Sequence, residues 1–284
     1  ISMFQNDASF LPSAKDGSVK IIESHNCRYY RLLRNENFIN RFVSRLRFYN
    51  DNRIIKRYDA FITLTQEDKR DWPSSENIHI IPNPLTIGCE ENADFNGKRA
   101  IAAGRFDYQK GYDNLVRAWA LVERRHPDWE LLIIGSQDDT AYVNYIKKLI
   151  EESGLKRIVL RPSTKAIEEE YLKSNMLVLT SNFEGLPLVL IEGMSFGLPL
   201  VSFDCKCGPS DIIRDGENGF LIKDKNIEVF ADRVCRLIED RDLHARMSTK
   251  ALEYSKLYDV HNIMAQWTSL FDELMASKKN NLSS

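Results

Sequence analysis

The segment from Gly104 to Gly111 combines two glycines with two cations. Gly104 follows a short apolar run, Arg99–Ala103, and lets the backbone turn sharply. Arg105 and Lys110 then flank one loop just before an expected helix, and two cations beside a helix N-terminus suit a pyrophosphate group. A surface loop with solvated charges would account for the same residues. The spacing matches neither a Walker loop nor the Gly-x-Gly-x-x-Gly dinucleotide fingerprint.

Two glutamates follow further along the chain, one on each side of an expected helix start. Glu184 lies in a loop after an apolar run, and Glu192 lies about a turn and a half into the helix, with the backbone N–H groups of Gly185 and Leu186 between them. Here Glu184 can accept hydrogen bonds from a hexose and Glu192 from a ribose, with phosphate at the helix N-terminus. The alternative is one solvated and one capping glutamate. However, Glu192 lies in a strongly apolar run, where a carboxylate without a partner is costly to bury.

A third group of residues runs from Cys207 through Gly208, Pro209, Ser210 and Asp211, followed by a turn at Asp215–Gly219. Ser210 or Asp211 can cap a helix. Taken alone, these residues favour a cap and a turn as much as a ligand site.

The scaffold for these residues alternates strands and helices from residue 98 onward, which predicts a parallel sheet covered on both faces. The expected strands are Arg99–Ala103, Glu130–Ile134, Ile158–Leu160, Met176–Thr180, Pro199–Phe203 and Gly219–Ile222. The expected helices are Asp113–Arg125, Tyr142–Glu152, Ile167–Lys173 and Pro187–Phe196, with two or three more from Ile227 to Ala276.

The residues with chemical potential follow the strands of this predicted doubly wound domain. Gly104, Gly135 and the segments Ser181–Gly185 and Asp204–Ser210 each come directly after an expected strand. Because the carboxyl ends of parallel strands meet at one edge, where such folds bind ligands, we expect all four loops to line one rim.

The first part of the chain has a similar but shorter pattern. Strands are expected at Val19–Ile22, Ala60–Leu64 and Ile78–Ile81, with a long basic helix from about Asn37 to Arg57. The chain opens on Ile-Ser-Met-Phe without an initiating Met, so we expect an upstream segment to be absent and this domain to be incomplete. The expected division is a partial N-terminal domain over 1–84, a linker over 85–97, a second α/β domain over 98–262, and a final helix over 263–284.

Composition limits the classes of function. The chain has 284 residues with a formal net charge of -2, so as a whole it lacks the basic excess of nucleic-acid-binding proteins. Residues 1–84 hold 13 Lys and Arg against 10 Asp and Glu, whereas the remainder is acidic, which predicts different partners for the two parts. No apolar stretch of the length of a transmembrane helix occurs.

The five cysteines (Cys27, Cys89, Cys205, Cys207 and Cys235) are odd in number and irregular in spacing, unlike a disulfide framework. Cys205 and Cys207 lack the two-residue spacer and the second pair expected of a zinc site. We therefore predict thiols in a reducing cytosol and no metal site.

Taken together and in order, these motifs resemble glycosyltransferase family 4. The resemblance extends from about residue 19 to the end and is strongest over 98–222. It implies the GT-B fold, an α/β architecture of two Rossmann-like doubly wound domains. In that fold the domain over 98–262 would bind the nucleotide-sugar, the partial domain over 1–84 would lie on the acceptor side, and the final helix over 263–284 would cross back to the first domain. The Gly-Pro-Ser-Asp segment is similar to members that build bacterial surface polysaccharides and protein-linked glycans.

The resemblance also implies roles for individual residues. Arg105 and Lys110 would neutralise the diphosphate leaving group, and Glu192 would hold the ribose. Glu184 would hold hexose hydroxyls, with the Gly185 and Leu186 amides near the phosphate or sugar. His25 matches a histidine that faces the donor sugar. Because His25-Asn26 stands where many members have His-Asp, its detailed role is less defined, and a polar loop histidine would look the same.

The region Arg28–Arg57 is strongly basic, with nine Lys and Arg against Glu36 and Asp51, interleaved with aromatic and apolar residues. An anionic membrane surface or a lipid-diphosphate acceptor suits this pattern, and so does a solvated helix face over a core stripe. The expected location is the cytoplasm, with peripheral contact on the inner face of the membrane and no nucleic-acid partner.

The implied activity is transfer of a hexose or N-acetylhexosamine from a nucleoside-diphosphate sugar, with UDP as the expected nucleotide, to a glycan or lipid-linked acceptor with retained configuration. Electrostatic stabilisation of the leaving group by cations would make a metal or other cofactor unnecessary. Two alternatives remain at this point: a non-catalytic nucleotide-sugar-binding subunit, and another GT-B enzyme such as a nucleotide-sugar epimerase.

Overall fold

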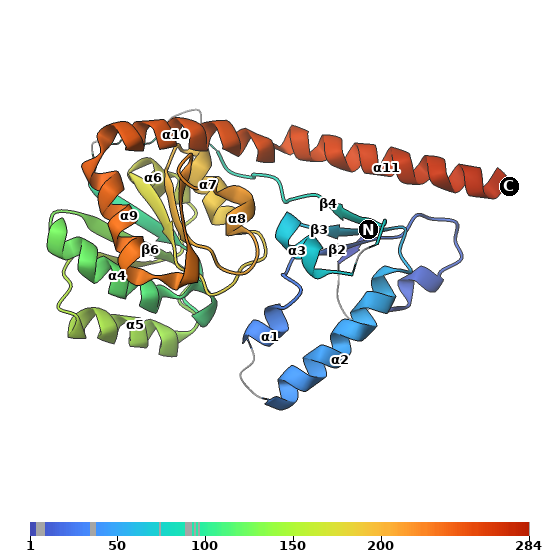
Figure 1. Ribbon diagram of the computed structural model, residues 1–284, viewed down its shortest axis with the longest axis horizontal. Helices are drawn as coiled ribbons and strands as arrows, with labels where there is room; N and C mark the ends of the chain where they lie inside the picture. The colour runs from blue at the N-terminus through green and yellow to red at the C-terminus, as the bar shows by residue number, and fades with distance from the viewer. Residues whose placement is uncertain are drawn as a thin grey trace. The chain divides into compact units, whose positions relative to one another are not determined.

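A computed structural model describes residues 1–3, 9–34, 38–73, 75–88, 93, 95 and 97–283 (Figure 1). The chain forms two compact units. Unit 1 contains Ile1–Pro84, Glu184–Leu186 and Tyr258–Ser284, and unit 2 contains Leu85–Phe183 and Pro187–Leu257. Positions 89–92, 94 and 96 of the expected linker lie outside the described residues.

Unit 2 is built on a six-stranded sheet in which all the paired strands are parallel, in the order β10-β9-β8-β5-β6-β7. The strands are β5 (Arg99–Ala103), β6 (Glu130–Gly135), β7 (Ile158–Pro162), β8 (Met176–Leu179), β9 (Leu200–Phe203) and β10 (Gly219–Ile222). The helices are α4 (Tyr112–Arg125), α5 (Thr140–Glu152), α6 (Ile167–Leu172), α7 (Leu188–Ser195), α8 (Pro209–Ile212), α9 (Ile227–Glu239) and α10 (Arg241–Ser255). These strands and helices begin and end close to the predicted positions.

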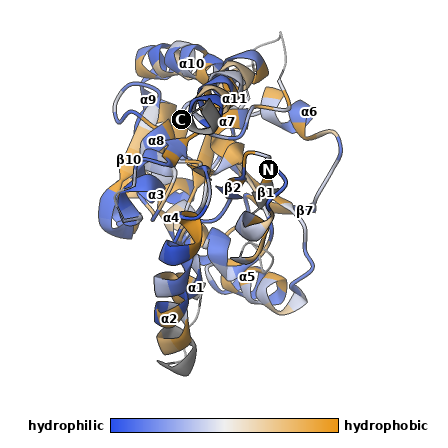
Figure 2. Ribbon diagram, turned by 90° about the vertical axis from the view of Figure 1, so that its right-hand side faces the viewer, coloured by the Kyte–Doolittle hydropathy of each residue, from blue (hydrophilic) through white to orange (hydrophobic). Residues whose placement is uncertain are grey.

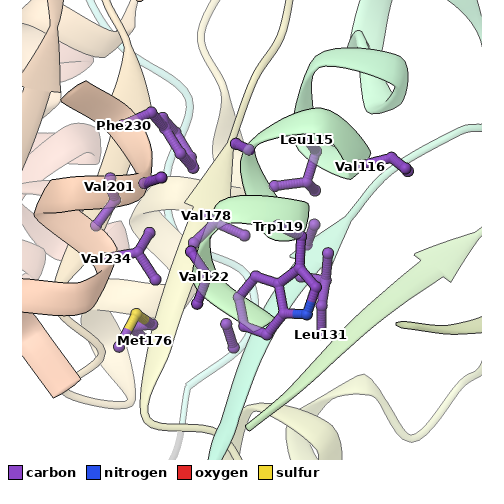
Figure 3. Close-up of a cluster of buried hydrophobic side chains, with 14 of the residues drawn as sticks. Leu115, Val116, Trp119, Val122, Leu131, Met176, Val178, Val201, Phe230 and Val234 are labelled. Atoms are coloured by element: carbon purple, nitrogen blue, oxygen red, sulfur yellow. The ribbon is translucent and has the colours of Figure 1, made fainter. Parts of the chain in front are cut away.

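The core of unit 2 lies on both faces of this sheet, as continuous apolar strands require. On one face, Leu115 and Trp119 of α4 pack with Leu131 of β6 and with Phe230 of α9, as Figure 3 shows. On the other face α7 approaches so closely that a Cβ atom on Gly193 would lie 2.7 Å from the Leu177 side chain. The strands are therefore clamped between helices, which holds their carboxyl ends in a fixed arrangement.

Unit 1 contains a four-stranded parallel sheet in the order β1-β2-β3-β4. Its strands are β1 (Ser2–Met3), β2 (Ile21–Ser24), β3 (Ala60–Thr63) and β4 (Ile78–Ile80), and its helices are α1 (Tyr30–Arg34), α2 (Phe38–Ile55), α3 (Gln66–Asp71) and α11 (Val260–Ser283). Alternate strand residues face opposite sides. Phe61 packs with Ile55 of α2 and Trp72 on one face, whereas Ile62 packs with Ile263 and Leu270 of α11 on the other.

Two predicted boundaries in these elements are wrong. The strand expected at Val19–Ile22 lies two residues later, because Glu23 and Ser24 pair with Ile62 and Thr63 of β3 and continue the ladder. Ser210 and Asp211 do not cap a helix. Gly208, with a φ of 98°, precedes the short helix α8, and both residues lie inside it.

Candidate functional site

The rim of unit 2 begins with a close approach between two glycines at the ends of adjacent strands. Gly104 follows β5 with a φ of 151°, and its N–H donates to the carbonyl of Ile134 at 3.0 Å. A Cβ atom on Gly135 would lie 1.7 Å from the carbonyl oxygen of Gly104. Only glycine can occupy position 135 without moving the backbone, so the turn after β5 is set by backbone packing.

The phosphate loop, as we name residues 104–111 after their predicted role, is closed by its own side chains. The Asp107 carboxylate accepts from the Lys110 N–H at 3.2 Å and caps the short 3-10 helix Tyr108–Lys110. Gly111 then takes the left-handed conformation, with a φ of 61°, and starts α4. The loop thus ends at the N-terminus of a 14-residue helix, where backbone N–H groups favour an anion.

Two polar residues after β8 hold this loop, and neither was predicted as part of the site. The buried Thr180 hydroxyl donates to the Gly111 carbonyl at 2.9 Å. The Asn182 side chain donates to the Tyr108 carbonyl at 2.6 Å, and its N–H donates to the Gln109 carbonyl at 2.7 Å. The sequence indicated only that the segment after β8 shares the rim. Hydrogen bonds between residues 69 and 74 positions apart leave no local pattern in the sequence.

The two predicted cations have different surroundings. The Arg105 side chain is 66% exposed, and its guanidinium lies 3.4 Å from the Asp107 carboxylate and 3.3 Å from the Gln109 side chain. The Lys110 stem instead packs over Gly104, where an added Cβ atom would come within 2.6 Å of it. Gly104 therefore leaves room for the Lys110 stem to return across the start of the loop.

Glu192 lies partly buried in α7 with a defined partner. The Tyr171 hydroxyl of α6 donates to its carboxylate at 2.7 Å. Burial raises the pKa of Glu192, and the hydrogen bond from Tyr171 and the charge of Lys110 partly oppose that rise. Burial, with Glu192 close by, also raises the pKa of Tyr171 well above its ordinary value, so this hydroxyl stays a donor. The structure thus brings Gly104, Gly135, Arg105, Lys110 and Glu192 into unit 2.

Other predicted site residues belong to unit 1. Glu184, Gly185 and Leu186 form part of this unit, and Glu184 is buried. His25 follows β2, and its Nε2 atom lies 3.0 Å from the Glu23 carboxylate. Its Nδ1 atom lies 3.5 Å from the Asn83 amide nitrogen. The ring of His25 is thus oriented between the Glu23 carboxylate and the Asn83 amide.

Two arginines of the basic region of unit 1 have partners within the unit. The Arg28 guanidinium lies 4.7 Å from the centre of the Trp72 ring and donates to the Asn52 side chain at 2.8 Å. Arg31 pairs with the Asp51 carboxylate at 3.3 Å, and burial raises the pKa of Asp51. These contacts give Arg28 and Arg31 a structural role. The side chains of Arg34 and Arg41, and all of Glu36, lie outside the described residues.

The thiols of Cys27, Cys205, Cys207 and Cys235 are buried, and Cys89 lies outside the described residues. In unit 2, His126, Cys235 and Glu239 hold potential metal-ligand atoms within 4.8 Å of one another. The Arg125 guanidinium already donates to the Glu239 carboxylate at 3.1 Å, so this carboxylate is paired with an arginine. We interpret this cluster as an ion-pair network.

Among the helices in the part of the chain that the structure describes, none combines the length and the apolar character of a membrane span.

Comparison with known proteins identifies the scaffold. A family model described as "Glycosyl transferases group 1" matches residues 90–254. The chain is 32% identical to the amylovoran biosynthesis glycosyltransferase AmsD of Erwinia amylovora, over 75% of the chain and 62% of AmsD. It is 37% identical to a poly(ribitol-phosphate) alpha-N-acetylglucosaminyltransferase of Staphylococcus aureus, over 76% of the chain and 44% of that protein. The chain thus spans less than two thirds of the length of these relatives.

Solved structures share the fold. A structure of S. aureus TarM, described as a complex with Fondaparinux, alpha-GlcNAc-glycerol and UDP, matches with a TM-score of 0.74 at 27% identity. The match covers 89% of this chain and 50% of TarM. Together with the two parallel sheets, this confirms the predicted GT-B fold class and the resemblance to glycosyltransferases.

Proposed function

The chain belongs to the glycosyl transferases group 1 family, and we propose that it carries the donor site of a retaining enzyme. This enzyme would transfer a hexose or N-acetylhexosamine from a UDP-sugar to a glycan or lipid-linked acceptor in bacterial cell-surface polysaccharide synthesis. The names of the relatives support this proposal, since one acts in amylovoran biosynthesis and another forms an alpha-N-acetylglucosaminyl product. The structural neighbour TarM is described with UDP.

The observation that carries the proposal is that Lys110 of the phosphate loop lies close enough to Glu192, within unit 2, for its charge to lower the pKa of that carboxylate. Arg105, Lys110 and the first amides of α4 would stabilise charge on a departing diphosphate. Glu192, fixed by Tyr171 at 2.7 Å, would accept hydrogen bonds from the ribose hydroxyls. Because cations and helix amides supply the positive charge, we propose that no metal or other cofactor takes part.

We also propose sugar-binding roles for two residues of unit 1, Glu184 and His25. Glu184, with the amides of Gly185 and Leu186, would hold hexose hydroxyls. His25 would face the sugar and form a hydrogen bond to it in place of its present contact with Glu23. These two roles follow the family resemblance, and their test is turnover once the acceptor is known.

Calorimetric titration of UDP and GDP tests the donor site. We expect UDP to bind, and Lys110→Ala and Glu192→Ala each to weaken the binding by about tenfold, since each removes one charged hydrogen-bond partner. Lys148→Ala is the matched control, because Lys148 is an exposed lysine of α5 paired with Glu152 at 3.5 Å. If the native chain binds UDP and neither site variant weakens that binding, this donor site is ruled out.

We further propose that α2 rests on an anionic membrane surface at the inner face of the cytoplasmic membrane. Phe42, Leu46 and Tyr49 lie on one face of the helix and are 56%, 59% and 68% exposed. The buried residues Phe48 and Ile55 lie on the other face. Figure 2 shows hydrophobic and hydrophilic stretches alternating along this helix. An apolar stripe beside arginines is typical of a helix that lies in a lipid interface.

Co-sedimentation with vesicles tests this contact. We expect the chain to bind phosphatidylcholine vesicles only when phosphatidylglycerol is added, and Phe42→Ser with Leu46→Ser to weaken the binding at least about fivefold. Tyr145→Ser, at an exposed aromatic residue of α5 in unit 2, is the control. Equal binding by both variants, or no binding to anionic vesicles, would contradict the proposal.

A further inference from the structure

Asn182 lies three residues beyond the end of β8 and makes two short hydrogen bonds to the phosphate loop. Its side-chain amide donates to the Tyr108 carbonyl at 2.6 Å, and its backbone N–H donates to the Gln109 carbonyl at 2.7 Å. These carbonyls belong to the two residues that precede Lys110. Asn182 therefore holds the part of the loop that places the lysine.

A second residue supports Asn182 from the end of β10. The Lys225 ammonium donates to the Asn182 side-chain oxygen at 2.6 Å. Asp224 and Lys225 both adopt positive φ angles, 55° and 50°, although neither is glycine. Left-handed conformations at successive non-glycine residues are costly and persist where surrounding contacts hold them. This left-handed turn therefore lies beside Asn182, joined to it by the Lys225 ammonium.

These contacts divide the support of the loop into two parts. Thr180, which is buried, holds the Gly111 end at the start of α4. Asn182 holds the Tyr108–Gln109 end on the more exposed side. The residues between these anchors include Lys110, and Arg105 reaches the same stretch through its hydrogen bond to Gln109. Asn182 thus holds the backbone just before Lys110 and the residue that Arg105 contacts.

We propose that Asn182, supported by Lys225, is a positioning residue that keeps Lys110 and Arg105 directed at the diphosphate of the donor. This inference rests on the proposed function, since it assumes a diphosphate at this rim. Small displacements of charged groups lower catalytic efficiency steeply, because their stabilisation depends on preorganised geometry. Asn182 itself need not touch the donor.

Comparing UDP with uridine tests the role, since uridine lacks the diphosphate. By calorimetry, or by competition for weak ligands, we expect Asn182→Ala to weaken UDP binding about tenfold and to leave uridine binding and Tm unchanged. Lys225→Ala should weaken UDP binding about threefold. The double variant should bind UDP no more weakly than Asn182→Ala, because two residues in one chain of contacts are not additive.

The outcomes separate this inference from the proposed function. If Lys110→Ala weakens UDP binding and Asn182→Ala does not, the positioning role is wrong while the donor site stands. Equal weakening of UDP and uridine by Asn182→Ala, or a fall in Tm to match, would assign Asn182 a general structural role instead. If Lys110→Ala has no effect on UDP, the donor site itself is wrong and the inference falls with it.

Discussion

The two units place polar residues at their sheets in different ways. In unit 2 the rim is shaped by backbone packing, because Gly135 lies against Gly104 and hydroxyl or amide groups tie the loops together. In unit 1 the residues beyond β2 are held by charged side chains. The Arg28 guanidinium stacks on Trp72, and the backbone N–H of Arg28 donates to the buried Asp68 carboxylate at 2.7 Å.

This difference determines what each unit tolerates. The Gly104–Gly135 turn is set by backbone packing, so it does not depend on pH but cannot accept added atoms. The stability of a region that contains a buried carboxylate depends on protonation. Three substitutions test this contrast.

The largest expected effect is at the glycine contact. Gly135→Ala would place a Cβ atom 1.7 Å from the Gly104 carbonyl, so the backbone must move, and we expect a loss of about 3 kcal/mol or more in unfolding free energy. Chemical denaturation of the purified variant measures this loss. Gly154→Ala is the control, because Gly154 has a φ of 67° but nothing within 4 Å of the added atom. It should cost about 1 kcal/mol, and equal losses would mean that the close contact is unimportant.

The next effect concerns the pH dependence of unit 1. Burial is the main reason that the pKa of Asp68 rises to about 6. The folded state therefore binds this proton more tightly than the unfolded state, and stability falls as pH rises from about 4 to about 6, by on the order of 2–3 kcal/mol. Denaturation curves for the native chain and Asp68→Asn at pH 4 and pH 7 measure the effect. We expect Asp68→Asn to lose this part of the pH dependence. An unchanged pH dependence would show that Asp68 titrates normally.

The smallest effect is at the buried carboxylate of unit 2. Because burial raises the pKa of Glu192, its charge costs stability at neutral pH. Glu192→Gln keeps an acceptor for Tyr171 and removes the charge, so we expect Tm to rise by about 2 °C at pH 7. The same variant should bind UDP more weakly. A fall in Tm would mean that the Tyr171–Glu192 pair stabilises the fold.

Much of unit 2 could be predicted from sequence, because its strands are continuous apolar runs that end at glycines or polar residues. The strand Arg99–Ala103 was predicted with the bounds that the structure shows. Unit 1 was harder to predict. The polar residues Glu23 and Ser24 looked like a loop, yet ladder hydrogen bonds to β3 extend the strand through them.

The site could be predicted in part. The cations of the phosphate loop are recognisable by their spacing around glycines, and the apolar surroundings of Glu192 indicated that it needs a partner. Nothing in the sequence identified that partner as Tyr171, 21 residues away. In the same way, Arg28 and Arg31 looked like part of an exposed basic region. Their pairing with Asn52 and Asp51 depends on how α1 and α2 pack.

Helix α11 has a consequence for the order in which the chain can fold. It supplies Ile263 and Leu270 to the core of unit 1, although all of unit 2 lies between this helix and the strands of unit 1 along the sequence. On the ribosome, Ile62 and its neighbours are synthesised long before their cover. Unit 2, made without a break apart from Glu184–Leu186, can complete its core first. One apolar face of the unit 1 sheet stays uncovered until α11 has been synthesised. A stalled or truncated nascent chain would therefore expose that face to chaperones and to aggregation.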